Sequence, residues 1–197
     1  MTRTESHVAS LDQIYDELVA LDAARARPPV QNWQPAVTGT IDIRIAVDGV
    51  WHHEGRPIQR ESLVRLFASI LRLDPEGYSL VTPAERLFIT VEDAPFIAVD
   101  LEIKGAGDTQ SLLFVTNVGD AVILDVSHPL RMGGSANEPR PYVMVRDGLE
   151  ARVSRAVFYR LVGLAVARSE PSGAAMEGEG TLFSVRSSGR WFDLGTA

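Results

Sequence analysis

Hydrophobic residues near the start of the chain recur with the 3.6-residue period of an amphipathic helix. The residues that follow this period are Leu11, Ile14, Leu18 and Leu21. Pro28 and Pro29 would end the helix near Arg27, because proline has no N–H and clashes with the preceding turn. The stretch from 28 to 39 shows no period, which predicts an extended linker with Trp33 as its hydrophobic anchor. We therefore expect residues 1–38 to form a helix and a proline-rich linker.

The period then changes to two, which is typical of strands. Hydrophobic residues alternate over 41–47, Asp48-Gly49 is a two-residue hairpin turn signal, and 50–53 is the return strand. A helical period over 60–73 follows, and two short strands are expected at 78–82 and 86–92. Residues 39–95 are thus predicted to be an N-terminal α+β repeat with the order β-β-α-β-β.

Three further strands are predicted in the middle of the chain, at 95–103, 112–118 and 120–126. The stretch 127–140 contains Gly133-Gly134 and no periodicity, so we expect a mobile loop. After residue 140 the order of hairpin, helix and two strands recurs. The segments are a hairpin at Asp147-Gly148, a helix over 154–169, and closing strands at 181–186 and 190–194. We assign 96–197 to a larger C-terminal α+β domain that includes the three middle strands.

The two hairpin-plus-helix blocks resemble each other, which predicts an α+β protein with a duplicated β-β-α-β-β core in two subdomains. Both hairpins turn at Asp-Gly, and Arg60 and Arg65 match Arg155 and Arg160 in the two helices. Chance similarity of two such units is the alternative. If the duplication is real, a cleft between the copies is the natural place for a ligand.

The composition is that of a globular protein and excludes a disordered chain, a collagen or a coiled-coil rod. The chain has 197 residues, of which 45% are hydrophobic, and no cysteine. Disulfides, thiolate metal sites and a cysteine nucleophile are therefore excluded. No apolar run reaches the roughly 18 residues of a membrane span, and the charged first residues do not form a signal peptide. We expect a cytoplasmic protein that does not bind membranes.

The charge pattern does not favour a nucleic-acid partner, and its local excess of arginine is compatible with a small anionic ligand. The formal net charge is −7, which does not favour binding to a nucleic-acid polymer. Lys104 is the only lysine among 19 basic residues. Arginine binds carboxylate and phosphate in a bidentate manner, although a GC-rich genome explains the same bias. Residues 140–168 carry a local excess of arginine, which fits a small anionic ligand or simply a solvated helix face.

Sequence motifs for common chemistries are missing. There is no G-x-S-x-G elbow and no Walker loop, and Gly105-x-Gly107 lacks the third glycine of a dinucleotide fingerprint. His52 and His53 are adjacent on a predicted strand, so they point to opposite faces and predict no metal site. No histidine or lysine stands at a position that would support an acid or base, so we assign no catalytic role to any of the carboxylates. We expect no cofactor.

What remains is the placement of arginines at the starts of the two predicted helices, where free N–H groups also favour anions. Such a site suits phosphate groups, with aromatic rings such as Trp51, Phe96 or Tyr142 as stacking faces. The candidate ligand-binding residues are Arg56, Arg60, Arg152, Arg155, Trp51, Thr82, Glu85 and Asn117. The alternative is that these arginines pair with nearby acids and cover the sheet edges.

Several ordered segments together resemble one bacterial family. They are the DG-W hairpin, Arg56-Pro57-Ile58, LVRLFASILR, Thr82-Pro83-x-Glu85, VEDAPF, FVTNVGD and VRDGLEARVSRAVFYRLV. From about Trp33 to Leu194 the chain resembles the domain-of-unknown-function family 1285 (DUF1285). The resemblance implies a two-part α+β protein with a duplicated core, whose second part is superficially pleckstrin-homology-like. It also implies a nucleotide-based ligand between the parts and a role in signal transduction.

Three functions therefore stay open. The first is a non-catalytic binding or sensing protein for a small anionic, nucleotide-like ligand. The second is a hydrolase or transferase acting on a phosphorylated small molecule, with Glu85 or Asp93 as base. The third is an adaptor that binds a protein partner through an exposed sheet edge and takes no small molecule.

Overall fold

The computed structural model describes residues 27–135, 138–168 and 181–196. The chain divides into two compact units between Asp93 and Ala94. Each unit is mostly β and contains a six-stranded mixed sheet and one helix. The helix predicted ahead of Arg27 lies outside the described residues. No helix within the described ranges is long and apolar enough to cross a membrane.

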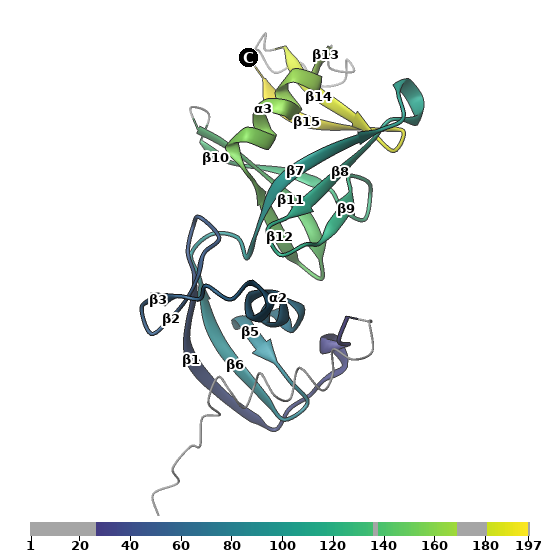
Figure 1. Ribbon diagram of the computed structural model, residues 1–197. Coiled ribbons are helices and arrows are strands. Elements are labelled where there is room, and N and C mark those ends of the chain that lie inside the picture. The colour runs from purple at the N-terminus through teal and green to yellow at the C-terminus, as the bar shows by residue number, and fades with distance from the viewer. Residues whose placement is uncertain (1–26, 136–137, 169–180, 197) are drawn as a thin grey trace, which may run out of the picture. The chain divides into compact units, whose positions relative to one another are not determined.

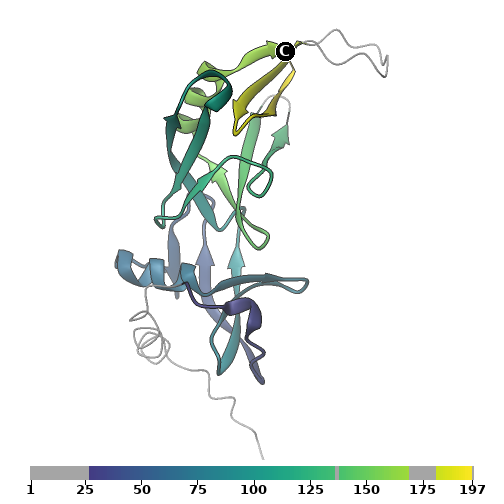
Figure 2. The same cartoon turned by 90° about the vertical axis from the view of Figure 1, so that its right-hand side faces the viewer.

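The N-terminal unit is a sheet with one helix lying across a face of it (Figures 1 and 2). Its elements are η1 (Val30–Asn32), β1 (Val37–Ile45), β2 (Trp51–His53), β3 (Arg56–Pro57), α2 (Glu61–Ser69), β4 (Leu71–Asp74), β5 (Gly77–Val81) and β6 (Glu85–Val91). The strand order is β3-β2-β1-β6-β5-β4. The central strands β1 and β6 are parallel, and the other neighbours are antiparallel. The Asp48-Gly49 turn joins β1 to β2 as predicted, with Gly49 at φ 83°.

The C-terminal unit contains a second six-stranded sheet, a helix and a three-stranded sheet. Its elements are β7 (Phe96–Lys104), η2 (Gly107–Thr109), β8 (Ser111–Thr116), β9 (Ala121–Ile123), β10 (Leu130–Ser135), β11 (Glu138–Arg146), β12 (Leu149–Val153), α3 (Arg155–Leu164), β13 (Val166–Arg168), β14 (Leu182–Ser187) and β15 (Arg190–Thr196). The large sheet has the order β10-β11-β12-β7-β8-β9, with β7 and β12 parallel at its centre. The small sheet is β13-β14-β15.

The two large sheets repeat one topology, so the duplication of the core is confirmed. The repeated unit is six strands and not the predicted β-β-α-β-β, because α2 lies between the two halves of its sheet in the chain whereas α3 follows the last strand of its sheet. In each sheet two antiparallel three-stranded meanders join through a central parallel pair, and the strands follow the same chain order. The correspondence of elements differs from the prediction, however. The Asp147-Gly148 hairpin, β11–β12, occupies the place of β5–β6 and not that of the Asp48-Gly49 hairpin. Two hairpins with equal turns look alike in sequence, whereas the long-range pairing of β12 with β7 decides their place in the sheet.

Both helices end earlier than their periodicity predicts. The helical pattern over 60–73 breaks after Ser69, and Leu71–Asp74 becomes β4, which pairs with β5. In the same way α3 ends at Leu164, and Val166–Arg168 becomes β13. Short apolar runs fit either a helix or a strand, so the backbone pairing available to each run decides between them.

The predicted loop over 127–140 is wrong, because most of it forms the hairpin of β10 with β11. Gly133 pairs with Arg140 and Gly134 pairs with Pro139. The two glycines allow this close pairing. A Cβ atom on Gly133 would lie 2.9 Å from the Tyr142 ring. Glycine lowers strand propensity, so the pattern of the sequence hides a strand that tertiary packing requires.

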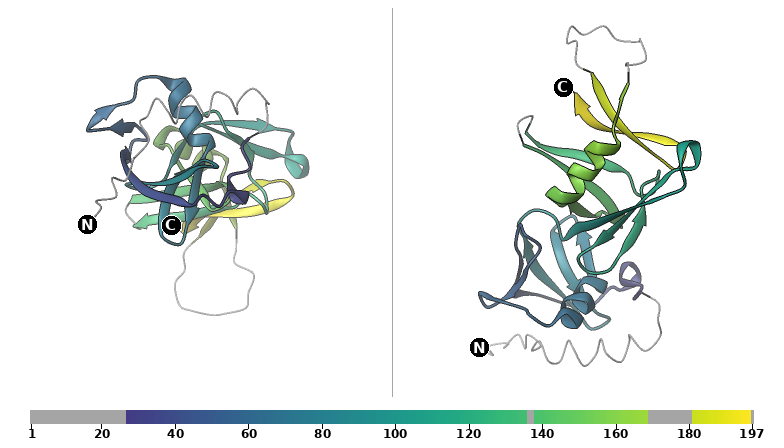
Figure 3. Two further views of the ribbon diagram at one scale, coloured as in Figure 1. Left: turned by 90° about the horizontal axis from the view of Figure 1, so that it is seen from below. Right: turned by 45° about the horizontal axis from the view of Figure 1, so that its top comes forward.

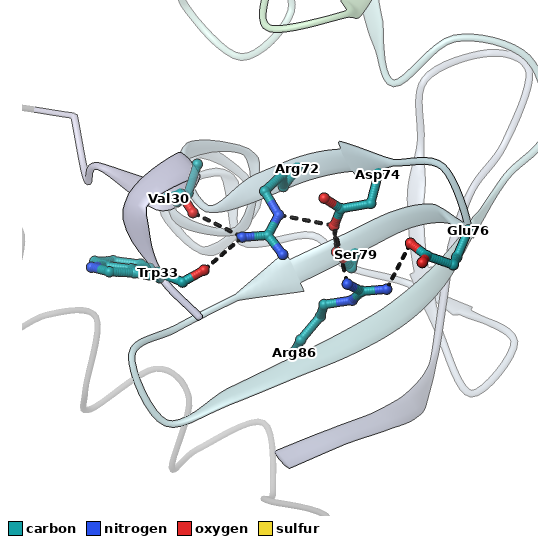
Figure 4. A network of polar contacts seen from close by, with 7 residues as sticks. All are labelled: Val30, Trp33, Arg72, Asp74, Glu76, Ser79 and Arg86. Carbon is teal, nitrogen blue, oxygen red and sulfur yellow. Dashed lines mark hydrogen bonds and ion pairs between the residues drawn. The ribbon is translucent and has the colours of Figure 1, made fainter. Parts of the chain in front are cut away.

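An arginine network attaches the linker to the N-terminal unit (Figure 4). Arg72 is 4% exposed, and its guanidinium donates to the carbonyl oxygens of Val30 and Trp33 at 3.0 and 2.9 Å. It also donates from Nε to Asp74 at 2.9 Å, and Arg86 approaches the same carboxylate at 3.6 Å. Val30 is the buried residue of the linker, whereas Trp33, the predicted anchor, is half-buried and contributes its carbonyl.

The core of the C-terminal unit includes Val157 and Leu161 of α3, which packs against β7 and β14. Ser187 joins the two sheets of this unit. Its hydroxyl accepts from the Leu112 N–H at 2.9 Å and donates to the Leu124 carbonyl at 2.7 Å. This buried hydroxyl fixes the β14–β15 hairpin to the end of the large sheet.

Candidate functional site

A cavity of about 390 Å³ lies where β11, β12 and α3 meet in the C-terminal unit. Its described lining residues are Glu138, Pro139, Arg140, Pro141, Arg152, Val153, Arg155, Phe158 and Tyr159. We call it the arginine pocket. Two of the residues that the sequence analysis selected for anion binding, Arg152 and Arg155, line it together.

The strand-to-helix junction brings these two arginines together. Arg152 is near the end of β12 and Arg155 is the first residue of α3, so only Val153 and Ser154 separate them. Ser154 is the N-cap, and its hydroxyl accepts from the Val157 N–H at 3.4 Å. A capped helix start holds its first residues in one direction relative to the preceding strand.

Two prolines shape the opposite wall. Pro139 and Pro141 lie on β11, and proline has no N–H to donate to a neighbouring strand. The pairing of β11 with β12 begins only at Tyr142, which lies opposite Arg152. The start of β11 is therefore paired on the β10 side alone, and its other side borders the pocket with Arg140 between the two prolines.

The pocket carries a positive charge on an acidic chain. Three arginines and one glutamate, Glu138, give its described lining a formal charge of +2. Arg140 Nη2 donates to Glu138 Oε1 at 3.0 Å, but the two side chains are 39% and 71% exposed. An ion pair this exposed contributes little to stability and can be rearranged by a ligand.

Arg155 is oriented by its own helix. Its Nε donates to the Tyr159 hydroxyl at 3.2 Å, one turn further along α3, and its guanidinium carbon lies 5.8 Å from the centre of that ring. The Tyr159 hydroxyl, followed by Glu138, raises the pKa of Arg155 above its usual value. Any arginine is charged at the pH relevant to binding, and the bond to Tyr159 holds this guanidinium at the pocket.

A second arginine pairs with the carboxylate that lies two residues before Arg152 in β12. Arg131, Tyr142 and Arg152 lie side by side across β10, β11 and β12. Arg131 makes two bonds to the Glu150 carboxylate, at 3.0 and 2.5 Å, and its guanidinium lies 4.3 Å from the centre of the Tyr142 ring. The negative charge of Glu150, which is two residues before Arg152, is thereby paired with Arg131.

The structure places the other two selected arginines in the N-terminal unit. Arg56 is exposed on β3, and Arg60 is exposed at the N-cap position of α2. Arg60 Nε donates to the Ser62 hydroxyl at 3.1 Å. Their participation in one site with Arg152 and Arg155 stays a prediction.

Two of the candidate ligand-binding residues, Thr82 and Asn117, hydrogen-bond to the backbone. The Thr82 hydroxyl accepts from the N–H groups of Ala84 and Glu85 at 3.2 and 3.1 Å, which closes the turn between β5 and β6. The side-chain oxygen of Asn117 accepts from the Ile97 N–H at 3.0 Å and holds the start of β7. Both side chains are short hydrogen-bonding groups of the kind that stabilise turns.

The remaining selected residues are buried in the N-terminal unit. Trp51 is 1% exposed and stacks on Phe67 with ring centres 6.3 Å apart. Glu85 is 8% exposed at the start of β6. Burial of this degree does not favour a direct role in ligand binding. Of the other rings considered for stacking, Phe96 is fully buried and Tyr142 is 7% exposed.

Arg140, Phe158 and Tyr159 also line the arginine pocket, although none of them is among the candidates that the sequence indicates. A signal for Tyr159 exists in the sequence, since residues four apart lie on one face of a helix and Arg155 is four residues earlier. No local signal indicates Arg140, because it lies at the start of β11 between two prolines, within the stretch 127–140 that shows no periodicity. Within the described ranges, no three histidine, aspartate or glutamate side chains gather where a metal ion could bind.

Comparison with known proteins confirms the family resemblance. A model of the DUF1285 N-terminal domain, a domain of unknown function, matches residues 28–94. A model of the DUF1285 C-terminal domain, from a protein of unknown function, matches residues 95–194. No curated protein matches the chain.

Two crystal structures are also similar to this chain. A DUF1285 family protein from Silicibacter pomeroyi DSS-3 is 43% identical with a TM-score of 0.76, and the match covers 91% of this chain and 95% of that chain. A DUF1285 family protein from Shewanella baltica OS155 is 28% identical with a TM-score of 0.49, and the match covers 61% of this chain and 90% of that one.

Proposed function

The chain belongs to the DUF1285 family, and from this premise we propose that it is a non-catalytic binding protein for a small anionic ligand. The ligand site is the arginine pocket of the C-terminal unit. The observation that carries the proposal is the convergence of Arg140, Arg152 and Arg155 on one cavity of a chain whose net charge is −7.

Arginine chemistry defines the ligand class. A guanidinium presents its N–H groups in a planar fork that matches two oxygens of a phosphate or carboxylate. Arg152 and Arg155 come from the end of a strand and the start of a helix, so they reach the pocket from rigid elements. A concave site of one charge sign also concentrates oppositely charged ligands and raises their rate of association.

An exposed aromatic ring at the same pocket supports a nucleotide-like ligand. Tyr159 is 61% exposed and lines the cavity beside Arg155. Aromatic faces of this kind stack on nucleobases, while arginines bind the phosphates. Tyr159 therefore takes the stacking role for which the sequence analysis considered Trp51, Phe96 or Tyr142.

Binding without turnover fits the carboxylates near the pocket. A general base has to be within hydrogen-bond reach of the proton that it removes. Glu138 is the carboxylate of the described lining, and it pairs with Arg140. Glu85 and Asp93, the bases considered for a hydrolase or transferase, are not among the described lining residues of the pocket.

The wider role follows from the family resemblance rather than from the pocket. We propose that ligand binding serves sensing in bacterial signal transduction. A cleft shared by both copies and a pleckstrin-homology-like C-terminal part stay predictions. Neither is needed for the pocket, because function depends on the site and not on the fold class.

Calorimetric titration of the purified full-length protein with inorganic phosphate and a panel of nucleotides tests the proposal. We expect at least one anion to bind, and Arg155→Ala and Arg152→Ala to weaken it about tenfold or more, as loss of a charge-assisted hydrogen bond does. Arg190→Ala is the matched control, because Arg190 is an exposed arginine at the start of β15 and outside the arginine pocket.

Two results would contradict the proposal. If both pocket variants bind every anion as the wild type does, the site assignment is wrong. If the protein converts a nucleotide to product, with or without Mg²⁺, the enzyme alternative replaces simple binding. The same titration with Arg60→Ala decides whether the first copy contributes, since only a shared site predicts weaker binding in that variant.

A further inference from the structure

A second cavity, of about 660 Å³, adjoins the arginine pocket in the C-terminal unit. It is bordered by β10, α3 and the β14–β15 hairpin, and Figure 3 (right) shows α3 between these strands. The side chains that give it its character are Met132, Phe158, Val162, Phe183 and Leu194. We call it the apolar groove.

The two cavities share two lining residues and are therefore adjacent. Pro139 and Phe158 line both of them. Phe158 belongs to α3, one turn before Val162 in the groove and next to Tyr159 in the arginine pocket. The groove therefore begins within one helical turn of the part of α3 that borders the arginine pocket.

The chemical character changes abruptly from one cavity to the other. Three arginines line one cavity, whereas the polar side chains among the described lining of the other are Ser135 and Thr196. Val162 is 49% exposed although it lies beside other apolar side chains. A contiguous apolar surface that stays open to water is a mark of a binding site.

We propose that the ligand of the arginine pocket is an amphiphile: its head, which can itself be nucleotide-like, carries a phosphate or carboxylate group, and an apolar chain is attached to it. The head binds Arg152 and Arg155, and the chain lies in the apolar groove. This inference rests on the proposed function, because it assigns the second half of the ligand held in the arginine pocket. A groove of this volume is within the range of about 300–1,000 Å³ typical of small-molecule sites.

Alkyl phosphates of increasing chain length test the inference on the full-length protein. Ethyl, octyl and dodecyl phosphate are titrated calorimetrically below the concentrations at which they form micelles. Dodecanoate repeats the series with a carboxylate head and distinguishes the two head groups. We expect affinity to rise about three- to fourfold for each CH₂ group that the groove buries.

A charged residue in the groove provides the matched variant. Val162→Glu changes an exposed side chain of the groove, so we expect it to fold and to lose the dependence on chain length. Val126→Glu is the control, because Val126 is 63% exposed and lies outside both cavities. Ethyl phosphate, which has almost no chain, should bind the wild type and both variants alike.

The outcomes separate the inference from the proposed function. Equal affinity for ethyl and dodecyl phosphate, with both lost in Arg155→Ala, would overturn the amphiphile and keep the anion site. No binding of any anion would overturn both.

Self-association that Val162→Glu abolishes, without dependence on chain length, would assign the groove to a second copy. Binding to anionic vesicles alone would assign it to a membrane surface, and either result overturns the inference.

Discussion

Gly134 lies so close to Glu138 that a Cβ atom at position 134 would be 2.2 Å from the Glu138 carbonyl oxygen. The backbone at Gly134 is also left-handed, with φ at 80°. This approach forms the end of the β10–β11 hairpin, next to Arg140 of the arginine pocket and along one side of the apolar groove. The geometry of both cavities thus depends on the absence of a side chain at position 134.

We expect Gly134→Ala to destabilise the C-terminal unit by about 1–3 kcal/mol. The added methyl group would clash with the backbone, and alanine would have to adopt the left-handed conformation that glycine adopts without strain. Urea unfolding measures the change, and calorimetry of the same variant should show weaker anion binding as Arg140 is displaced. Gly163→Ala is the control. Nothing lies within 4 Å of a Cβ there, and alanine in α3 should stabilise by about 0.5–1 kcal/mol. Equal effects of the two substitutions would contradict this account.

Removal of the buried guanidinium of Arg72 should destabilise the N-terminal unit strongly. Arg72→Met leaves the carbonyls of Val30 and Trp33 without this donor, and the expected cost is about 3–5 kcal/mol. Chemical denaturation measures the cost, and hydrogen exchange should show faster exchange in η1. Arg65→Met is the comparison, because Arg65 forms a solvent-exposed ion pair with Glu61. Such a pair contributes about 0.5 kcal/mol or less to the free energy of unfolding. A loss for Arg72→Met no larger than that for Arg65→Met would mean that the linker is held in another way.

The ionised Glu92 carboxylate should stabilise the fold in a pH-dependent manner. Its pKa is lowered below the ordinary 4.5, first by the hydrogen bond from the Val47 N–H and then by Arg44. A lowered pKa in the folded state gives a stabilisation that is present above 4.5 and is lost as the pH falls through the folded value. The pKa of Asp100 is also lowered, first by a hydrogen bond from Arg160 and then by one from the Leu101 N–H, so its ionised carboxylate stabilises the fold with the same direction of pH dependence.

Glu92→Gln tests this dependence. The variant should be less stable than the wild type near neutral pH, and the difference should disappear in acid as the wild-type carboxylate is protonated. Unfolding curves across the acid range, together with an NMR titration of the Glu92 carboxyl, measure both quantities. A difference that stays constant from neutral to acid pH would show that the charge has no role.

The two helices begin differently, which predicts opposite effects of substitution at their caps. Ser154 caps α3 with its hydroxyl, so Ser154→Ala should cost about 1 kcal/mol. Arg60 occupies the N-cap of α2 without a side-chain cap bond, so Arg60→Ser should gain about 0.5–1 kcal/mol. Thermal unfolding of both variants measures the two changes. A loss in Arg60→Ser would indicate that the arginine contributes more to the fold than its exposed position implies.

Part of the candidate site could be found from the sequence because it is local. Arg152 and Arg155 are three residues apart at a strand-to-helix junction that the hairpin turn and the helical period both indicate. Arg140 and Tyr159 were missed for different reasons. The helical spacing of Tyr159 from Arg155 places both residues on one face of α3. Arg140, in contrast, reaches the pocket only because β10, β11 and β12 pair in their observed register.

The sequence by itself determined the local elements: both Asp-Gly hairpins, the starts of α2 and α3, the three middle strands and the two closing strands. Each follows from hydrophobic period, turn residues or caps, which act over a few positions along the chain. The tertiary structure alone decided that β12 pairs with β7, that Ser127–Arg140 contains a strand, and that Trp51 faces the core. These outcomes depend on pairing and burial between segments far apart in the chain, which no local pattern encodes.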